Sequence, residues 1–484
     1  MNKFLILVSV LFLFRYSYSQ EFLGVRNSNY AGMQSVFLNP ASMVNTKTKW
    51  DISLVSAGMF IDNDFFYIPR RQVSPFGFKK MINGIKDNRI LSSRYDPQNP
   101  NRRYQLVSSG AVIGPSFYLP LNPVSKIGFT IAVRGYANLH EVPGHFVQNM
   151  YKNLKDSSLW NTQWEDHSTK FNSMSWLEYG LHYGRVLYQS AGRELNIGFS
   201  LKYLQGITAA YTKNTNLTYS VADSNTITLS HSALDYGGTQ DFPDRKLRNL
   251  VHGNGLSESI GFTYIFLRDP GCNANMTTDA GNVFGTEYSY KIGISLIDFG
   301  FINFNRHSSA YHLLTDSATY SGIGQSSASE NTGLQRSLTD ILYQNDSIKH
   351  LTANRIQMAL PSAVSIQADW NVYNHYYLNA TFVKGLGHAG KPGVIRPDLY
   401  SITPRYASAW FEASLPVSLL YYGHWQPRIG VAFRIGYFFF GGDAPGGLSG
   451  IADLERADVY AGIHYFPLER KHRSKYLQCP VSRY

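Results

Sequence analysis

Apolar and polar residues alternate with a period of two along much of this sequence. The segment "RIGVAFRIGYFFF", residues 428–440, illustrates the pattern. One set of alternate positions in it is apolar, namely Ile429, Val431, Phe433, Ile435, Tyr437 and Phe439. The other set holds Arg428, Arg434 and small residues. Successive side chains of an extended strand point to opposite faces. The segment is therefore predicted to be one strand with an apolar face and a polar face.

The same alternation recurs in other segments and favours a membrane barrel. These segments lie at residues 126–134, 177–184, 195–203, 290–295, 364–372 and 458–465. Their polar faces carry glycine and isolated charges, and Tyr and Phe cluster at their ends, as in outer-membrane barrels. Strands in lipid must close, because an open edge leaves backbone hydrogen bonds unsatisfied. The predicted fold is all-β, an antiparallel outer-membrane β-barrel. A soluble exported sandwich, with its apolar faces turned inward, is the alternative.

The connections between these segments alternate between long and short. Residues 387–405 form one of the long links, whereas 373–374 and 423–427 form short turns. Surface loops and periplasmic turns of outer-membrane barrels alternate in this way. The count gives twelve strands. Residues 215–232 are predicted to form a further hairpin, which either projects outside or raises the number of strands to fourteen.

Composition agrees with a β-rich membrane protein. The 484 residues include 34 Tyr and 29 Phe, and charged residues make up only 16%, compared with about 25% in an average soluble protein. Strand-forming aromatic residues and few charges suit β-structure. No run of about 20 apolar residues follows the N-terminal segment, so a transmembrane helix is not expected.

The N-terminus is predicted to be a secretion signal. A short basic region precedes an apolar core at residues 4–14, and Ser17 and Ser19 supply a small-x-small exit. Cleavage is expected before Gln20, which removes residues 1–19. The mature protein is therefore expected in the outer membrane.

The chain is basic and contains two cysteines. In an exported protein, a formal net charge of +11 fits anionic membrane surfaces, a lumen lining or a partner better than nucleic acid. No binding of nucleic acid is therefore expected. Cys272 and Cys479 both fall on the short-turn side of the predicted barrel. They either form a disulfide, as we hypothesise, or remain two unpaired thiols.

The sequence lacks a recognisable catalytic or metal-binding pattern. In "HEVPGH", residues 140–145, the two histidines are five residues apart, whereas zincins place them at i and i+4 of one helix. Pro143 and Gly144 also interrupt a helix, so a surface turn is predicted there. "GGLSG", residues 446–450, does not match the G-x-S-x-G nucleophile elbow. We expect neither an enzyme nor a bound metal or cofactor.

Ionisable residues on the polar faces are the candidate site residues. Facing lipid near the bilayer centre, each charge would cost about 2–4 kcal/mol, so these residues are predicted to face the lumen. They are Arg134, Glu178, His182, Lys202, Lys291, Asp369, Glu412, Arg428, Arg434, Asp458 and His464. They form either a permeation or ligand path or a salt-bridge network that supports the barrel and holds a plug.

The segment "NYAGMQSVFLNPASMVNTKTKWDISLVSAGMF", residues 29–60, resembles the amino-terminal region of FadL-like channels and PorV-type barrels. The whole chain is more similar to Bacteroidota outer-membrane proteins of a family of unknown function. The resemblance implies fourteen strands and an N-terminal plug inside the lumen, in which Asn39, Pro40 and Ala41 are plug residues. Alternatively, these three residues only form a turn into the first strand. The implied organisation is a plug at 20–48, a barrel at 49–467 and a basic periplasmic tail at 468–484.

Two functions follow from this resemblance as expectations. The first is an outer-membrane channel or transporter for small amphipathic or hydrophobic molecules, by analogy with FadL. The second is a scaffold that does not transport and instead docks secreted or surface proteins, as PorV-like barrels do. Lipid of the outer membrane is an expected partner in both.

Overall fold

A computed structural model describes residues 21–73, 90–190, 192–239, 250–268, 287–321, 350–388, 390–443 and 453–467. The expected signal peptide, the basic tail, Cys272 and Cys479 lie outside the described residues. Within these ranges, no helix is long and apolar enough to cross a bilayer.

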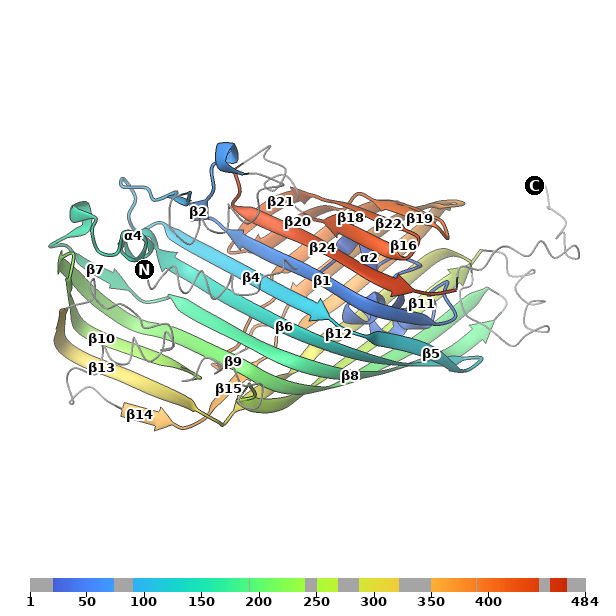
Figure 1. Cartoon of the computed structure of the whole chain (residues 1–484), viewed down its shortest axis with the longest axis horizontal. Helices are drawn as coiled ribbons and strands as arrows, with labels where there is room; N and C mark the ends of the chain where they lie inside the picture. Colours follow the sequence, from blue (N-terminus) through green and yellow to red (C-terminus); the bar gives the residue numbers. More distant parts are fainter. Residues whose placement is uncertain are drawn as a thin grey trace, which may run out of the picture.

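The strands form one antiparallel sheet that closes on itself, because β1 pairs with both β4 and β24 (Figure 1). The barrel has fourteen strands, four of which are interrupted, and it confirms the predicted fold class. Its wall consists of β1 (Asp51–Asn63), β4 (Arg103–Ile113), β5 (Ser116–Asn122), β6 (Ser125–Pro143), β8 (Lys170–Ser190), β9 (Arg193–Asp223), β11 (Gly253–Leu267), β12 (Tyr288–Phe304), β15 (Ile356–Ala359), β16 (Ala363–Tyr373), β17 (Tyr376–Gly385), β18 (Asp398–Ala407), β19 (Phe411–Ser414), β20 (Val417–Tyr422), β21 (His424–Ile429), β22 (Val431–Ile435), β23 (Phe438–Gly442) and β24 (Arg456–Tyr465).

Proline and glycine mark the four interrupted strands. Pro115 lies between β4 and β5, Pro361 between β15 and β16, and Pro416 between β19 and β20. Proline has no N–H to donate to a neighbouring strand, so a strand breaks there without leaving the sheet. Gly430 separates β21 from β22, and its N–H donates to the Pro416 carbonyl oxygen at 2.7 Å.

Two strands were not predicted from the sequence, and each begins or ends at a tight turn. β18 occupies the end of the predicted link 387–405 and turns at residues 408–410 into β19. Gly436, with φ of +58°, lies in the turn between β22 and β23. The prediction of one strand over 428–440 was therefore wrong. The turn shifts the alternation, so Phe439 faces the lumen at 1% exposure while Phe438 faces outward at 58%.

The predicted alternation of long and short links also fails at one place. A tight turn at Gly423 joins β20 to β21, and it lies beside Gln105 and Asp64, at the end of the barrel that carries the longer connections. Gly423 has φ of +76°, a conformation that favours glycine. The predicted short turn 423–427 therefore falls on the opposite end from the one expected.

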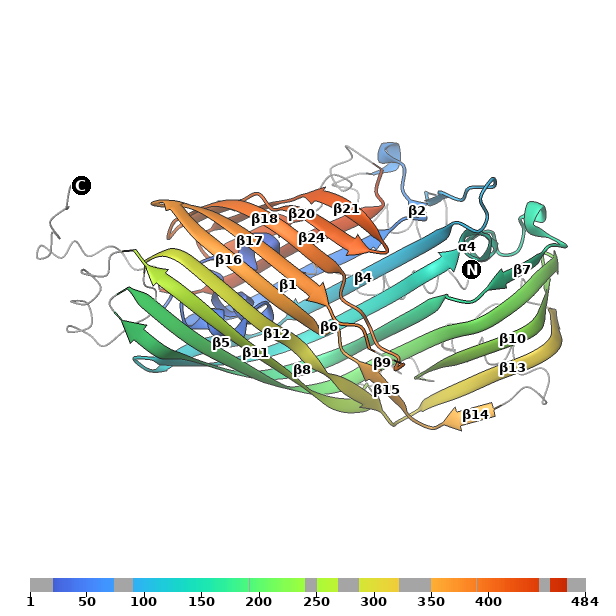
Figure 2. The ribbon, with the colours of Figure 1, turned by 180° about the vertical axis from the view of Figure 1, so that it is seen from behind.

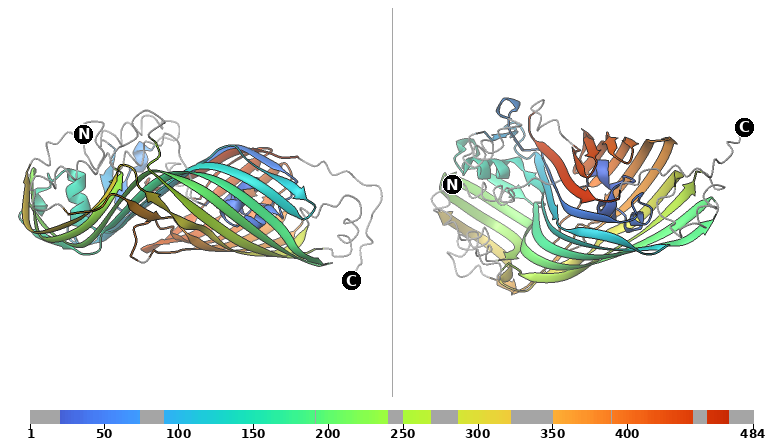
Figure 3. Two further views of the ribbon diagram at one scale, coloured as in Figure 1. Left: turned by 90° about the horizontal axis from the view of Figure 1, so that it is seen from below. Right: turned by 45° about the vertical axis from the view of Figure 1, so that its right-hand side comes forward.

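A curved sheet extends beyond this end of the barrel (Figures 2 and 3). It contains the far ends of β8 and β9 together with β7 (Gln163–Asp166), β10 (Thr226–Thr239), β13 (Ser308–Ser321) and β14 (His350–Ala353). The predicted hairpin at 215–232 belongs to β9 and β10 and projects outside the barrel. We call this sheet the extension.

A helix and several short elements flank the extension. Helix α4 (Gly144–Lys152) begins directly after Pro143, so the surface turn predicted for residues 140–145 was wrong. The short elements are β2 (Phe66–Tyr67), β3 (Ser92–Ser93), η3 (Arg70–Gln72) and η4 (Ser157–Leu159).

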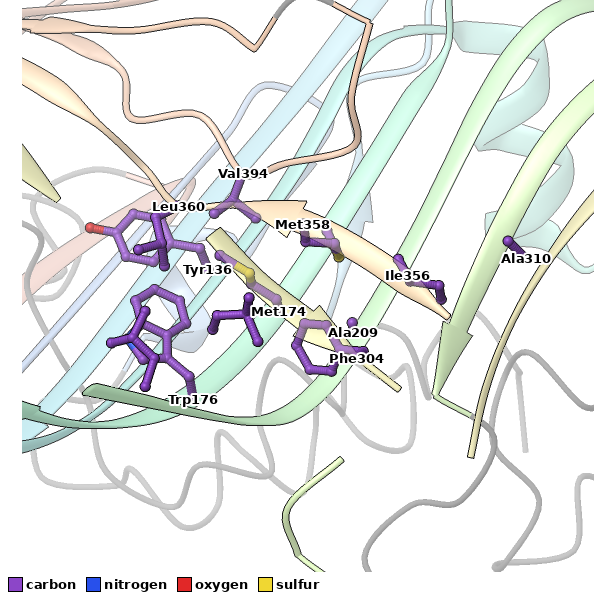
Figure 4. Packing of buried hydrophobic residues seen from close by; sticks show 12 residues of the cluster. Tyr136, Met174, Trp176, Ala209, Phe304, Ala310, Ile356, Met358, Leu360 and Val394 are labelled. Atoms are coloured by element: carbon purple, nitrogen blue, oxygen red, sulfur yellow. The ribbon is translucent and has the colours of Figure 1, made fainter. Parts of the chain in front are cut away.

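The wall reverses its polarity where the barrel meets the extension. On the barrel, the outward positions are apolar, and one register row holds Tyr203, Leu256 and Phe301, exposed by 45%, 57% and 47%. Towards the extension, the buried side chains become apolar instead, with Ile302 and Phe304 both at 0% exposure. They belong to a buried group that we call the mouth cluster (Figure 4). Since apolar outward faces belong in lipid, this reversal marks one edge of the membrane-spanning part.

Candidate functional site: the plugged lumen

Residues 21–48 fill the lumen and form the plug (Figure 1). Three short helices make up half of it, namely α2 (Leu23–Arg26), η1 (Gly32–Phe37) and η2 (Pro40–Met43). Every residue from 21 to 48 is buried or half-buried, including its polar residues. Buried polar groups must form hydrogen bonds, so the contacts between plug and wall define the site.

Asn39 begins η2 and also attaches it to the wall. Its Oδ1 accepts a hydrogen bond from the Ala41 N–H at 2.9 Å, as expected of an N-cap residue. Pro40 follows as the first helical residue, where its missing N–H has no cost. The Asn39 Nδ2 donates to the Phe262 carbonyl oxygen and to the Gln367 Oε1, at 3.2 and 3.0 Å.

Glycines of the wall provide the space for η2. A Cβ atom on Gly198 would lie 2.2 Å from the Ala41 nitrogen, and one on Gly261 would lie 2.1 Å from the Asn39 Oδ1. One on Gly293 would lie 2.8 Å from the Asn39 Nδ2. Hence β9, β11 and β12 present bare backbone to the plug. The inward glycines that the sequence pattern revealed are thus contact points for another segment.

The plug also contacts the place where the barrel closes. Asp51 of β1 accepts a hydrogen bond from the Met33 N–H of the plug at 3.2 Å. Its other carboxylate oxygen lies 3.0 Å from the Nδ1 of His464, on β24. The Gln34 side chain donates to the Ser56 hydroxyl of β1 at 2.8 Å. Plug, first strand and last strand therefore meet at one carboxylate.

The candidate lumen residues are inside the barrel. Ten of them are buried, and Lys291 is half-buried; the ten are Arg134, Glu178, His182, Lys202, Asp369, Glu412, Arg428, Arg434, Asp458 and His464. Most belong to two ionic clusters at different heights in the lumen. Their role in permeation or in support stays a prediction.

The first ionic cluster contacts the N-terminal part of the plug. Glu412 pairs with Arg434 at 3.3 Å and with Arg405 at 3.5 Å, and Arg405 also pairs with Asp369 at 2.9 Å. The Ser28 hydroxyl of the plug donates to the Glu412 Oε2 at 2.6 Å. These charge-assisted hydrogen bonds attach the plug to β18 and β19.

The second ionic cluster surrounds Asp298 of β12. The carboxylate pairs with Arg134 at 2.9 Å, Lys202 at 2.7 Å and Arg396 at 2.8 Å. Glu178 pairs with Arg134 at 3.3 Å and with Lys202 at 3.7 Å. All five side chains are at most 7% exposed. Three cations therefore converge on one buried carboxylate.

Other candidates have local partners. The two ring nitrogens of His182 lie 2.9 Å from the Thr130 hydroxyl and 2.7 Å from the Ser200 hydroxyl. Arg428 pairs with Asp62 of β1. These contacts join neighbouring parts of the wall without involving the plug.

Lys291 and Asp458 line small cavities. Lys291 contacts the ring of Tyr288 and lines a polar cavity of about 20 Å³ beside the plug. Asp458 lines another cavity together with Glu21 and Asp443. Plug residues line both cavities.

Between β17 and β18, the described residues 386–388 and 390–397 cover the lumen from the other side, and we call these residues the lid. The Asn138 side chain of β6 donates to the Ile395 carbonyl oxygen at 3.0 Å and accepts from the Ile395 N–H at 2.7 Å. Val394 inserts into the mouth cluster with 0% exposure (Figure 4). Arg396 reaches Glu21 of the plug at 3.2 Å, so the lid and the plug are in direct contact.

Sequence reasoning missed several residues of these clusters. Asp298 lies in a β-bulge with φ of +54°, which interrupts the period of two on β12. Arg396 and Arg405 fall in the predicted link 387–405. The alternation could not assign any of the three to a face. The acidic and basic residues of the plug had no periodic signal at all.

Comparison with solved structures finds other outer-membrane barrels at very low identity. The toluene transporter TbuX of Ralstonia pickettii is 9% identical, with 93% of this chain and 97% of that chain covered and a TM-score of 0.41. The toluene transporter TodX of Pseudomonas putida is 8% identical, with 93% and 98% covered and a TM-score of 0.32. A Pseudomonas aeruginosa FadL homologue is 9% identical, with 90% and 94% covered and a TM-score of 0.27.

The search of curated proteins finds no match. A family model matches residues 40–443, from the NPAS box of the plug to the end of β23, and so spans most of the chain. The resemblance to a family of unknown function is thereby confirmed. This protein belongs to the family of unknown function DUF5723.

Proposed function

We propose that the protein is an outer-membrane channel that admits small apolar molecules and closes its lumen with two separate segments, the plug and the lid. The main support for the proposal is that a separate segment, and not the side chains of the wall, fills the lumen. At the positions that face η2, the wall has glycine and not large side chains. The wall therefore leaves room that a separate segment fills, and we infer that this segment moves when the channel opens.

The mouth cluster supports an apolar cargo. In the membrane-spanning part, the inward face carries buried polar residues together with apolar clusters that pack on the plug. The mouth cluster instead gathers Trp176, Leu204, Ile302 and Met358 under the lid. An apolar molecule that enters from the extension side would meet this surface once the lid has moved, and burial of apolar area favours its binding. Contacts of the lid over this surface include the two hydrogen bonds between Asn138 and Ile395, and the Val394 side chain in the mouth cluster. Arg396 adds ion pairs with Glu21 and Asp298. We expect these contacts to exchange without unfolding the wall.

Crosslinking of the lid tests the proposal. Cysteines introduced as Asn138→Cys and Ile395→Cys, with Cys272→Ser and Cys479→Ser as background, can be joined by a short bifunctional reagent. We expect a Gram-negative host whose outer membrane excludes the dye N-phenylnaphthylamine to take it up when it expresses the protein. Crosslinking at 138 and 395 should abolish this uptake. A crosslink between Tyr236→Cys and Tyr311→Cys, in register on the extension, should leave uptake unchanged.

The opposite outcome is also informative. If neither the native protein nor a variant that lacks residues 21–48 admits dye, although both barrels fold, the channel proposal is wrong. A barrel that stays closed in this way would favour the scaffold that docks secreted or surface proteins.

A further inference from the structure

Amide side chains form a continuous outward row just above the apolar part of the wall. Asn254 of β11 is in register with Gln205 of β9 and with Asn303 of β12, and Asn303 is in register with Gln357 of β15. All four are exposed or half-exposed. The row lies two residues along each strand from the apolar row of Tyr203, Leu256 and Phe301. We call these four residues the amide row.

Two cations lie beside the amide row, one at each side. The Lys391 ammonium of the lid donates to the Gln357 Oε1 at 3.3 Å, and the Gln357 amide donates to the Asn303 Oδ1 at 3.0 Å. Arg306, directly after β12, is exposed, and no described carboxylate lies within 4 Å of its guanidinium. The row therefore combines several N–H donors with two positive charges.

A depression is present at the Arg306 side of the row. Its volume is about 250 Å³, and its lining consists of Tyr203, Gln205, Val251, Gly253, Asn254, Asn305 and Arg306. Tyr203 belongs to the apolar row beneath, so the depression is continuous with the lipid-facing surface. A ligand in it would have one end at donors and a cation and the other end against apolar side chains.

The nearest acidic group on these strands lies lower on the wall. Glu258 of β11 faces outward one position below Leu256 and is in register with Leu201 and Phe299, both apolar. On the barrel portions of β9, β11, β12 and β15 that the structure describes, no other carboxylate faces outward. The Glu258 carboxylate would repel an anion at the amide row only weakly, because the two lie apart along the strand. Glu258 therefore provides a useful control.

We propose that the Arg306 side of the amide row binds the phosphate headgroup of an anionic lipid in the outer leaflet, and that Lys391 adds positive charge at the other side of the row. The acyl chains of the lipid lie on the apolar row of Tyr203, Leu256 and Phe301. Phosphate oxygens accept hydrogen bonds from guanidinium, ammonium and amide N–H groups. A basic residue at a membrane surface contributes about 1 kcal/mol to the binding of anionic lipid. The depression and its continuity with the apolar belt favour a lipid over a free anion.

Native mass spectrometry of the purified barrel in a neutral detergent tests the site. We expect saturable binding of phosphatidylglycerol, weaker binding of zwitterionic phosphatidylcholine, and no binding of diacylglycerol, which has no phosphate. The variant Arg306→Gln should bind phosphatidylglycerol about fivefold more weakly, and adding Lys391→Gln should weaken it further. Soluble glycerol phosphate should not compete, because it lacks the acyl chains.

Two variants separate a specific site from general attraction to a basic protein. Arg185→Gln removes another exposed outward arginine, near the opposite end of β8, and should not change binding. Glu258→Gln should leave binding unchanged or strengthen it. Equal weakening by Arg185→Gln and Arg306→Gln, or effective competition by glycerol phosphate, would overturn the proposal of a lipid site. Heat-modifiable mobility on gels verifies that each variant is a folded barrel.

Discussion

Single residues on the inward face of the wall serve two opposite purposes. Gly198 removes a side chain so that plug backbone can approach, whereas Asp298 supplies one carboxylate to which three cations bind. Both lie on strands with the same alternating pattern. Their roles differ because one faces the NPAS box and the other faces the junction of plug and lid. Substitutions at the two positions should therefore have different consequences.

Replacing Asp298 should destabilise the whole barrel. In Asp298→Asn, three buried cations lose their shared carboxylate, and breaking a buried ion pair in this way costs about 3–5 kcal/mol. Urea unfolding of the barrel in liposomes would measure the loss. Glu287→Gln serves as the control, because Glu287 pairs with Lys47 at an exposed position and should contribute at most about 1 kcal/mol. Equal effects of the two substitutions would contradict the assignment of Asp298 as the centre of the cluster.

Replacing Gly198 should instead loosen the plug. The methyl group of Gly198→Ala would overlap the backbone of Pro40 and Ala41, and such overpacking costs about 1–3 kcal/mol. We expect the plug to move, because the wall is held by strand pairing on both sides. Ion conductance in planar bilayers should rise above that of the native protein. In Gly114→Ala, outside the plug and the lid, the added methyl group would meet only the Ile131 carbonyl oxygen, at an ordinary contact distance of 3.6 Å, and conductance should not change. A rise in both variants would show that the effect is not local.

Among the elements, the extension has an apolar core of its own, separate from the lumen. Its buried side chains form their own apolar cluster, which includes Leu154, Tyr219, Val221 and Leu313. Helix α4 adds His145, whose ring stacks on Trp164 with 4.4 Å between centroids. The extension can therefore respond to solution conditions that the membrane-spanning strands do not sense.

Acid should weaken the extension through His145. Burial lowers the pKa of His145 to about 4, whereas an unfolded histidine titrates near 6.5. Asp166 opposes this shift, and Arg103 adds to it. The neutral ring lies 2.7 Å from the Tyr219 hydroxyl. Because the unfolded form binds the proton more tightly, the stabilisation is complete above pH 6.5 and is lost as the pH falls towards 4.

Limited proteolysis between pH 7.5 and 4.5 measures this loss. Local stability should fall by up to about 1.4 kcal/mol per pH unit. The variant His145→Gln should remove most of the dependence, whereas His167→Gln, at an exposed site, should retain it. A native pH profile in His145→Gln would show that another group titrates.

At the scale of the whole molecule, the sequence predicted the strands of the barrel wall better than the segments that fill and cover its lumen. Alternation located the barrel portions of long strands such as β6 and β9, because the apolar face is uninterrupted there. It missed the turns at 408–410 and at Gly436, because a tight turn needs only one or two residues and leaves the apolar pattern nearly continuous. The plug emerged from family resemblance alone. The lid, Asp298 and Arg396 could not be predicted, since their positions depend on contacts between segments far apart in the chain.

The shared carboxylate of Asp51 links two stages in the life of the molecule. It contacts the plug through Met33 and the last strand through His464. The first and last strands can therefore pair around a plug that is already in place. A nascent barrel built in this order never presents an open hole to the membrane. The safeguard against leakage would then be part of biogenesis itself, earlier than any regulation of the finished channel.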